Sequence, residues 1–493
     1  MFLQRKIALS TLWQLASQVT MAALSILTVK FVAVGLSKEL AGNYNSAYGF
    51  LQLFGILADF GLYAVAVREV SRAGDRKAEV LGALLILRTI ILFLSLGSAI
   101  VIVWLMPMWH GTPLPIGVTI AAFVPFFTLL AGIIRTVFQV EYRMHCVFIA
   151  EVAQRILTAS AIGLFIFFGV RSSDNPHVYE AFLGIGGAGA LLLFILSLLF
   201  ARRSMPLCLR WNNALLKKLI VAAAPFGLAY LCMALYRQFD VTLIALLRPD
   251  FELQNAYYGF VQRMADMGYL IPTFLLNSIL PLLSERHEHG EATESLLGKT
   301  LFAILICSSI SLLFSIFWAR PLIALLTTNA YLSTATQSGS DSVLRLIGFS
   351  MFFNGFILYG FYVLLTRHQW KRLVTILLFG GCLSLTSNII LIPQEGFMGA
   401  ATTSVIVHTA LGFLLLAEGL RAMPASFDWN DTIRWIGFAM PLAIFLFFSA
   451  PLLTSELKTI VGLGAATLLM GILAWVLGLD RGILRGIQKE NLV

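Results

Sequence analysis

Two stretches of an otherwise apolar chain place polar side chains at helical spacing, and these are its first candidates for chemistry. The octamers NSAYGFLQ (45–52) and NAYYGFVQ (255–262) share Asn, Tyr, Gly, Phe and Gln at matching positions, 210 residues apart. Residues three and four apart lie on the same face of a helix. Each octamer therefore starts a one-sided polar stripe. The two stripes consist of Asn45, Tyr48, Gln52, Gly55 and Asp59, and of Asn255, Tyr258, Gln262, Asp266, Tyr269 and Thr273.

A polar stripe inside a membrane must face other helices or water, because lipid offers hydrogen-bonding groups no partners. Such a stripe can hold helices together by hydrogen bonds, or it can line a hydrated cavity. The presence of two matching stripes favours the cavity. We therefore predict that Tyr48, Gln52, Tyr258 and Gln262 face one shared cavity.

Charged residues inside apolar runs form a second set of candidates. A charge at the middle of a bilayer costs at least about 2.5–3.5 kcal/mol, so such residues indicate a functional site. Arg237 and Asp240 stand three residues apart on one expected helix, and Arg263 and Asp266 repeat this spacing on the next. Either pair could instead be a self-neutralising contact that only fixes helix packing.

Two further pairs of charges are embedded in the first half of the chain. Asp59 and Arg88 lie at similar depths of neighbouring runs and could pair across two helices. Glu151 and Arg155 stand four residues apart, and their place near one end of a run favours a structural role.

The embedded charges contain an excess of cations. Seven cations (Lys30, Arg88, Arg135, Arg155, Arg237, Arg263 and Arg345) stand against four acids (Asp59, Glu151, Asp240 and Asp266). Arg135, Arg345 and Lys30 could extend their charged groups to the membrane surface. The remaining excess predicts a cationic cavity suited to a phosphate-bearing cargo. The candidate phosphate-binding residues are Arg237, Arg263, Lys30 and Arg88, and the candidates for coupling or gating are Asp240, Asp266 and Asp59.

Membrane-spanning helices have to position these residues. The chain of 493 residues is 59% hydrophobic and 12% charged, whereas soluble domains carry about 25% charged residues. Apolar runs of the roughly 17–25 residues that cross a bilayer follow one another along the chain. We predict an all-α polytopic membrane protein with fourteen transmembrane helices. The expected spans are 11–36, 43–67, 80–106, 116–139, 147–170, 181–201, 219–247, 255–283, 300–319, 343–365, 373–392, 397–419, 436–453 and 459–478.

The distribution of basic residues predicts the orientation of the chain. With the N-terminus placed in the cytoplasm, cytoplasmic segments hold 22 of the 34 Lys and Arg residues, and outer segments hold five. Short basic loops stay on the cytoplasmic side of a membrane. Both termini are therefore expected in the cytoplasm. The first run continues without a small-residue cleavage signal, which predicts an uncleaved span rather than a signal peptide.

The basic segment RRSMPLCLRWNNALLKK (202–218) divides the spans into six, six and two. An even number of spans per half gives both halves the same orientation, which is the parallel type of repeat. Under this division the octamers open the second span of each half. The predicted domains are an N-terminal lobe (1–201), the basic linker (202–218), a C-terminal lobe (219–419) and two final spans with a cytoplasmic tail (420–493).

Several classes of function are disfavoured. The net charge of +9 is spread in small clusters between apolar runs, which a positive-inside pattern explains without nucleic acid. The tripeptide GKT at 298–300 lacks the Gly that a phosphate loop needs five residues earlier, where Thr293 stands. The five cysteines show neither a disulfide framework nor the spacing of metal ligands. We expect no metal, no cofactor and no ATP site.

Three stretches together resemble one family of membrane proteins. The segment SKELAGNYNSAYGFLQLFGILADFGLYAVAVREVSR (37–72) is similar to the region of spans 1–3 in bacterial polysaccharide transporters, where Gly-x-Tyr follows a short outer loop and an Asp-Phe-Gly turn precedes a basic Arg-Glu loop. APFGLAYLCMALYRQFDVTLIALL (224–247) and NAYYGFVQRMADMGYLIPTFLLNSILPLLSE (255–285) resemble the seventh and eighth spans of the same family. These are the Wzx-type oligosaccharide-lipid flippases of the MOP superfamily, which also contains the MATE multidrug exporters and the lipid II flippases.

The resemblance implies two six-helix lobes around a central cationic cavity that opens alternately to each side of the bacterial inner membrane. The implied cargo is an undecaprenyl-pyrophosphate-linked oligosaccharide, which is turned over for export of an exopolysaccharide or O-antigen-type polymer. Charged residues of spans seven and eight matter for transport in such proteins, which points here to Arg237, Asp240, Arg263 and Asp266. A polysaccharide polymerase and export machinery are further implied partners. The resemblance implies a transporter and not an enzyme.

Three alternatives stay open at this point. A MATE-like exporter of drugs or metabolites would be expected to have a cavity dominated by acids and aromatic residues. A lipid II flippase would share the fold and carry a different cargo. A membrane glycosyltransferase or polymerase should show a paired-acid motif at the outer end of a span, where this chain has only scattered acids such as Glu39, Asp250 and Glu252.

Overall fold

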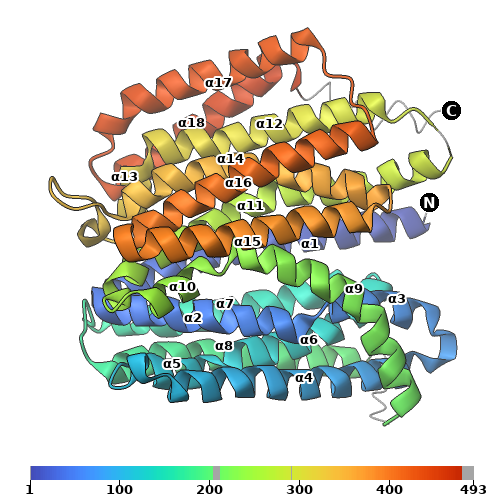
Figure 1. Ribbon diagram of the computed structural model, residues 1–493, viewed down its shortest axis with the longest axis horizontal. Coiled ribbons are helices and arrows are strands. Elements are labelled where there is room, and N and C mark those ends of the chain that lie inside the picture. Colours follow the sequence, from blue (N-terminus) through green and yellow to red (C-terminus); the bar gives the residue numbers. More distant parts are fainter. Residues whose placement is uncertain (1, 204–210, 290, 480–493) are drawn as a thin grey trace. The chain divides into compact units, whose positions relative to one another are not determined.

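The computed structural model describes residues 2–203, 211–289 and 291–479, and these ranges form helices joined by short turns (Figure 1). An isolated backbone bridge joins Leu36 to Ser173. Apart from this bridge, the described residues form helices and turns, which confirms the prediction of an all-α protein. Residues 204–210 of the predicted basic linker lie outside the described residues.

The chain divides into two compact units, Met1–Gly259 and Phe260–Val493. The division falls inside one long helix, α11 (Phe251–Glu288), whose first residues belong to the first unit. The lobe boundary at 202–218 was expected from charge and span number rather than from packing, and it stays a prediction.

The first unit consists of ten helices and the start of α11. The tightest packing joins α1 to α7, α6 to α8 and α7 to α8, and Figure 1 shows α4, α6 and α8 side by side. The helices are α1 (Phe2–Gly35), α2 (Lys38–Asp59), α3 (Leu62–Arg72), α4 (Lys77–Leu105), α5 (Leu114–Ala121), α6 (Phe123–Val140), α7 (Met144–Phe167), α8 (Pro176–Arg202), α9 (Asn213–Arg237) and α10 (Asp240–Leu247), with short 3-10 turns at Gly74–Arg76 and Pro107–Trp109.

The second unit packs α14 against α16 and α12, and α15 against α16. The last two helices join this bundle through Trp318, whose indole Nε1 donates to the backbone oxygen of Leu446 (2.9 Å) within a buried apolar cluster. The helices are α12 (Glu294–Phe317), α13 (Ala319–Leu326), α14 (Ser340–Thr366), α15 (Trp370–Glu395), α16 (Phe397–Ala422), α17 (Trp429–Ser449) and α18 (Glu456–Val476), with short 3-10 turns at Asn329–Tyr331 and Ala450–Leu452.

In the described part of the chain, eleven helical segments are long and apolar enough to cross a membrane. Three expected spans, 43–67, 219–247 and 255–283, are not among them. The multi-pass character is confirmed, and the number fourteen stays a prediction.

Two of the polar spans are broken helices, and each break falls at a predicted site residue. The expected span 43–67 ends as α2 at Asp59, because Phe60 and Gly61 both adopt the left-handed conformation (φ 40° and 68°) before α3 begins. Phe60 packs against Gly227 of α9, where a Cβ would lie 2.6 Å from its ring. The Asp-Phe-Gly sequence is therefore a helix-breaking turn.

The second break corrects the expectation that Arg237 and Asp240 share one helical face. Helix α9 ends at Arg237 and α10 begins at Asp240, with Gln238 and Phe239 between them. Arg237 thus lies in the last turn of one helix and Asp240 in the first turn of the next. Each charge opposes the partial charge of its helix end, which favours a discontinuous span here.

The starts of the two octamers lie where α2 packs against the start of α11, inside the first unit. A Cβ at Gly42 would lie only 1.6 Å from the backbone oxygen of Glu252, so α2 and the start of α11 meet backbone to backbone. The amide nitrogen of Asn45 donates to the backbone oxygen of Asn255 (3.1 Å). Both contacts join residues 210 apart, so these helix segments run parallel and in register.

Side chains at this contact complete a buried hydrogen-bond network. The amide nitrogen of Asn255 donates to Ser46 Oγ (2.8 Å) and to the backbone oxygen of Val241 (2.9 Å). The amide nitrogen of Asn43 donates to Glu252 Oε1 (2.8 Å). The Asn residues that open the two stripes therefore hold helices together, as the structural alternative proposed.

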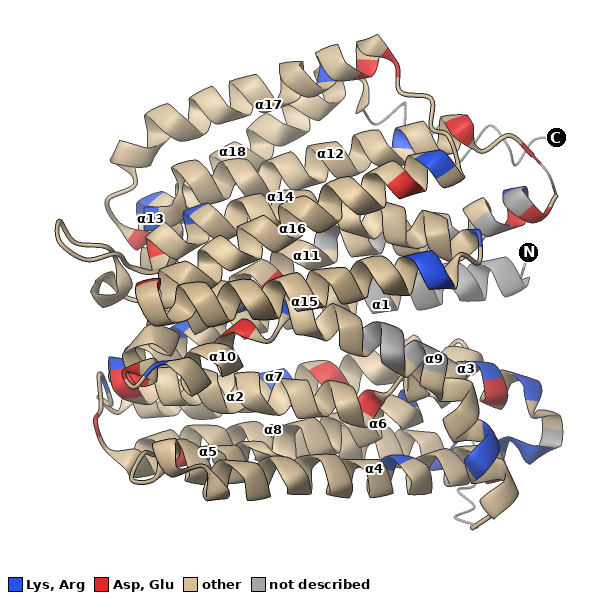
Figure 2. Cartoon of the chain, viewed as in Figure 1, with Lys and Arg blue, Asp and Glu red and all other residues tan. Residues whose placement is uncertain are grey.

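Basic residues gather at one end of the first unit, where α3 leads into α4 (Figure 2). Arg68 and Arg72 lie on α3, and Lys218 of α9 forms an ion pair with Glu69 (2.9 Å). These residues belong to the segments expected in the cytoplasm, and their clustering at one end of the bundle agrees with the positive-inside pattern. The orientation itself stays a prediction.

Candidate functional site

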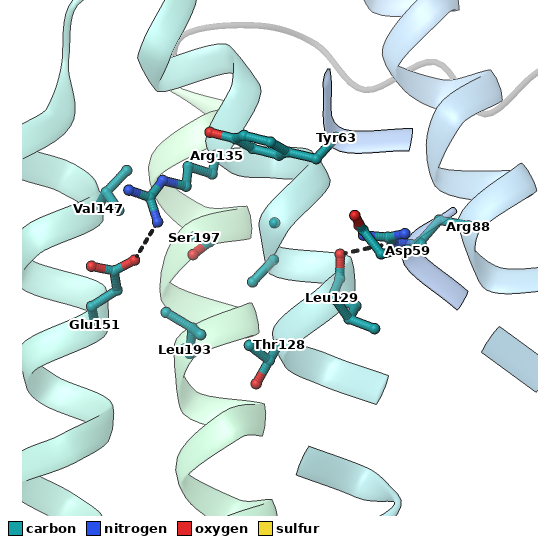
Figure 3. A pocket seen from close by; sticks show the side chains of 12 residues that line it. Asp59, Tyr63, Arg88, Thr128, Leu129, Arg135, Val147, Glu151, Leu193 and Ser197 are labelled. Carbon is teal, nitrogen blue, oxygen red and sulfur yellow. Dashed lines mark hydrogen bonds and ion pairs between the residues drawn. The ribbon is translucent and has the colours of Figure 1, made fainter. Parts of the chain in front are cut away.

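A cavity of about 470 Å³ lies within the first unit, among α2, α3, α4, α6, α7 and α8. Two ion pairs face it from opposite sides, with Thr128, Leu193 and Ser197 between them (Figure 3). The lining residues are Asp59, Tyr63, Arg88, Thr128, Leu129, Ala131, Gly132, Arg135, Val147, Glu151, Leu193 and Ser197.

The first ion pair forms where α2 ends. Because Phe60 and Gly61 stop the helix, the last backbone carbonyls of α2 have no partner within it. Arg88 of α4 takes this place: its guanidinium donates to the backbone oxygen of Ala58 (2.8 Å) and to that of Leu129 (3.3 Å), and it pairs with the Asp59 carboxylate. The guanidinium charge also offsets the negative end of the helix dipole. The sequence-based expectation that Asp59 and Arg88 pair is confirmed.

The burial of this pair is uneven. The Arg88 side chain is 1% exposed, whereas that of Asp59 is 30% exposed and faces the cavity. All three guanidinium nitrogens of Arg88 already have acceptors. Arg88 therefore acts mainly as an anchor between α2, α4 and α6, and Asp59 is the accessible partner.

The second ion pair links three helices. Arg135 of α6 pairs with Glu151 of α7 (Nη1–Oε1 2.8 Å), and the Ser17 hydroxyl of α1 donates to the same carboxylate. The Arg135 side chain is 22% exposed on the cavity wall. Its Nε is buried and has no hydrogen-bond partner among the described residues.

Tyr63 completes the polar wall. It lies in the first turn of α3, and the break before that helix turns its ring toward the cavity (Figure 3). Its hydroxyl donates to Gln139 Oε1 (2.6 Å). The cavity thus offers hydroxyl groups, two arginines and two carboxylates, with a net formal charge of zero. An anionic group in this cavity therefore competes with Asp59 and Glu151 for the two guanidinium groups.

Comparison with known proteins gives the family. A model of the polysaccharide biosynthesis protein family matches residues 7–287, which is more than half of the chain. The chain belongs to this family. No curated protein sequence matches the chain.

Solved structures show that this polysaccharide biosynthesis protein has the fold of the MOP superfamily. The lipid II flippase MurJ in an inward closed conformation superimposes with a TM-score of 0.70 at 14% identity, covering 96% of this chain and 99% of that one. An inward-facing MATE multidrug transporter of the MOP superfamily gives 0.63 at 13% identity, covering 81% and 94%. A MOP superfamily transporter from Pyrococcus furiosus gives 0.53 at 14% identity, covering 85% and 93%. The chain is thus a multi-pass membrane protein of the polysaccharide biosynthesis family with the fold that these transporters and flippases share.

In this family member, the predicted stripe residues have different surroundings. Tyr258 is fully buried, and its hydroxyl donates to Asp240 Oδ2 (2.6 Å). Tyr48 is half-buried with its hydroxyl against Gly186, where a Cβ would lie 2.7 Å away. Gln52 is exposed and Gln262 is half-buried. A cavity shared by all four therefore stays a prediction.

The other predicted residues lie outside the cavity of the first unit. Asp240 is buried beside Tyr258, and Arg237 is half-buried at the end of α9. Arg263 and Asp266 are half-buried on the part of α11 that belongs to the second unit, and Lys30 is half-buried on α1. Their roles in binding or coupling stay predictions, as does the central cavity.

Sequence reasoning missed several residues that the structure brings together. Arg135 was expected to reach the membrane surface, but it lines the cavity and pairs with Glu151, which was assigned to Arg155 by spacing. Helical spacing reports only pairs on one helix, whereas Glu151 takes its partners from α6 and α1. Nothing in the sequence distinguished Tyr63, Thr128 and Ser197 as cavity residues.

No group of three or more His, Cys, Asp or Glu side chains with the arrangement of a metal site occurs in the part of the chain that the structure describes. The same part contains four free cysteines, of which Cys146 and Cys232 are buried.

Proposed function

We propose that this protein is a flippase that moves an undecaprenyl-pyrophosphate-linked oligosaccharide from the cytoplasmic to the outer leaflet of the bacterial inner membrane. The family match over residues 7–287 carries this proposal, and the MOP fold supports it. The transport serves export of an exopolysaccharide or O-antigen-type polymer and proceeds by alternating access. Both termini lie in the cytoplasm in this proposal.

The cargo's diphosphate suits the cavity of the first unit. Arg135 has a buried Nε donor without a partner among the described residues, which a small movement of its side chain would turn toward the cavity, and a guanidinium whose counterion, Glu151, accepts a hydrogen bond from Ser17. A phosphate oxygen at Nε makes a charge-assisted hydrogen bond, which is worth about 1.5–3 kcal/mol. Because Glu151 stays beside the guanidinium, the net attraction is moderate. Moderate binding suits a transporter, which must release its cargo on the other side.

The membrane potential favours the proposed direction. Moving one charge across 100 mV changes the free energy by about 2.3 kcal/mol, so two negative charges leaving an inside-negative cell gain roughly 4–5 kcal/mol. Arg237, Arg263 and Lys30 are proposed as further cationic contacts for the diphosphate along its path. Asp240, Asp266 and Asp59 are proposed to couple or gate the movement.

Deletion of the gene followed by lipid extraction tests the function. We expect an undecaprenyl-pyrophosphate oligosaccharide to accumulate and the matching surface polymer to be lost. Unchanged lipid pools would refute the proposal. Increased drug sensitivity with normal polymer would indicate a MATE-like exporter, and accumulation of lipid II would indicate a lipid II flippase.

Replacing Arg135 by glutamine tests the cavity. We expect the rate of flipping in proteoliposomes to fall at least about tenfold, because one lost charge-assisted bond of 1.5 kcal/mol or more corresponds to that factor. Arg345→Gln is the matched control, since its side chain is 50% exposed and its nearest acid, Asp341, lies 3.8 Å away. Equal flipping rates for the two variants at equal expression would show that Arg135 does not contact the cargo during transport.

A further inference from the structure

A basic patch lies at one end of the first unit, outside the cavity, where the end of α3 and the starts of α4 and α9 come together (Figure 2). The segments 68–79 and 217–218 contain six basic and three acidic residues, so their net formal charge is +3. A surface with such an excess attracts anions. The basic residues of the patch are Arg68, Arg72, Arg76, Lys77, Lys217 and Lys218, and the acidic residues among them are Glu69, Asp75 and Glu79.

Two of the acids join the helices that carry the patch. Glu69 of α3 forms an ion pair with Lys218 of α9 (2.9 Å). Glu79 of α4 forms an ion pair with Arg76 (2.9 Å) and accepts a hydrogen bond from the amide of Asn212, the residue that caps the start of α9 (3.4 Å). The start of α9 is therefore tied to both α3 and α4, and the basic side chains of all three segments are held on one surface.

The charges around Glu69 show how crowded the cations are. The hydrogen bond from Lys218 lowers the pKa of Glu69, and the charges of Lys218, Arg68 and Arg72 act in the same direction, whereas partial burial acts against them. One carboxylate thus faces three cations. The side chains of Arg68 and Lys218 are 43% and 66% exposed, so their charges also act on what lies outside the protein.

Apolar side chains directly follow the patch on α9. Lys217, Ile220 and Val221 are spaced three and four residues apart and share one face of this helix. Ile220 is 43% exposed and Val221 is 65% exposed. The expected span 219–247 begins at this point, so this face passes from a charged group to an apolar surface within one helical turn.

An exposed tryptophan marks the same level. Trp211 precedes α9, is 60% exposed, and donates from its indole Nε1 to the side-chain oxygen of Asn213. Tryptophan is enriched where a membrane meets water, at the level of the lipid headgroups. A positive-inside pattern explains the basic residues of this end, but it requires neither the joining of three helices nor the apolar face beside the cations.

The combination favours a lipid over a soluble anion. A soluble anion uses only the charges, whereas an anionic phospholipid has a phosphate for the basic patch and acyl chains for the exposed apolar face of α9. Basic clusters between helices at the membrane surface bind anionic headgroups in this way.

We propose that the basic patch and Trp211 bind the headgroup of an anionic phospholipid, whose acyl chains lie against Ile220 and Val221. The lipid bridges α3 and α9 at the end where Glu69 and Lys218 already join them. This site goes beyond the proposed function and does not depend on it, because the lipid is a resident ligand of the surface and not the cargo.

Native mass spectrometry of the purified protein, titrated with phosphatidylglycerol or with phosphatidylcholine of the same chains, tests the site. We expect the tightest phosphatidylglycerol to bind with a Kd at least about fivefold below that of phosphatidylcholine. The double variant Arg72→Gln/Lys217→Gln should weaken phosphatidylglycerol binding at least about tenfold, because each basic residue at an anionic membrane surface contributes about fivefold. The ion pairs of Lys218 with Glu69 and of Arg76 with Glu79 remain in this variant.

The matched control removes two cations from the second unit. Arg372 and Arg421 share Glu418, and their side chains are 63% and 75% exposed. We expect Arg372→Gln/Arg421→Gln to keep the Kd of the wild-type protein. Equal weakening in the two double variants, or equal affinity of the wild type for both lipids, would overturn the proposal.

Photocrosslinking in the wild-type protein locates the lipid without any variant. Phosphatidylglycerol with a photoactivatable group in its acyl chain, close to the glycerol, should label the peptide that contains Ile220 and Val221 more strongly than the phosphatidylcholine analogue does. Millimolar inorganic pyrophosphate at matched ionic strength should leave this labelling unchanged. Equal labelling by both lipids would overturn the site. Loss of labelling with pyrophosphate would overturn the assignment to a lipid and indicate a site for soluble anions.

Discussion

Gly42→Ala is expected to lower the thermal stability of this protein by about 5 °C or more. The added Cβ would lie 1.6 Å from the backbone oxygen of Glu252 and 2.5 Å from its carbonyl carbon, so no side-chain rotation can relieve the clash. Overpacking costs about 1–3 kcal/mol and sometimes more, and each kcal/mol shifts the midpoint of a large domain by roughly 2–4 °C. Separation of α2 from α11 would also break the hydrogen bonds of Asn45 and Asn43.

The measurement is the temperature at which half of the detergent-solubilised protein is lost from the monodisperse peak in size-exclusion chromatography. Gly97→Ala is the matched control, because Gly97 also lies inside a helix and no atom lies within 4 Å of its added Cβ. We expect this control to be neutral or slightly stabilising, since Ala is favoured over Gly in helices by roughly 0.5–1 kcal/mol. Equal midpoints for the two variants would contradict the close backbone contact.

The second large effect is expected at Arg88. Arg88→Ala leaves the backbone oxygens of Ala58 and Leu129 and the Asp59 carboxylate without their donor. Breaking a buried ion pair costs about 3–5 kcal/mol, and the 30% exposure of Asp59 places this case near the lower end. The same assay should show a midpoint about 6 °C or more below that of the wild type.

Arg88→Lys separates charge from geometry. Lysine keeps the positive charge but lacks the planar fork that reaches three acceptors at once, so we expect it to restore only part of the stability. Arg372→Ala is the surface control, because its side chain is 63% exposed. Full stability in Arg88→Lys would show that the positive charge alone holds the end of α2. Wild-type stability in Arg88→Ala would refute the role of Arg88 as an anchor between α2, α4 and α6.

The sequence was sufficient to predict much of the fold, because spans and their polar faces are local patterns. The match between the octamers predicted that spans two and eight correspond, and the structure shows α2 and α11 in parallel register. The pairing of Asp59 with Arg88 could be predicted because both lie at similar depths of adjacent spans. The fold class and the polysaccharide family were predicted correctly from the resemblance.

The cavity could not be predicted, because its polar groups come from separate helices whose rotation about their axes is set by packing. Arg135 and Glu151 belong to α6 and α7, and Ser17 belongs to α1. The break between Arg237 and Asp240 was missed for a related reason. The apolar run through 219–247 has helical periodicity on both sides, and its interruption at Gln238 and Phe239 carries no Gly or Pro signal.

The register of α2 against α11 bears on how the chain arose. Gly42 touches Glu252 and Asn45 touches Asn255, so each position meets its own counterpart in the other copy. Contact of like with like is the mark of an isologous interface between two identical protomers. Such an interface would result if the gene of a parallel homodimer were duplicated and the two copies were fused.

Fusion also frees the two sides to diverge. In a homodimer one codon changes both faces at once, whereas here Asn43 corresponds to Leu253 and Ser46 to Ala256. The hydrogen bonds from Asn43 to Glu252 and from Asn255 to Ser46 therefore have no mirror images in the chain. A symmetric dimer of identical chains would form each of these bonds twice or not at all.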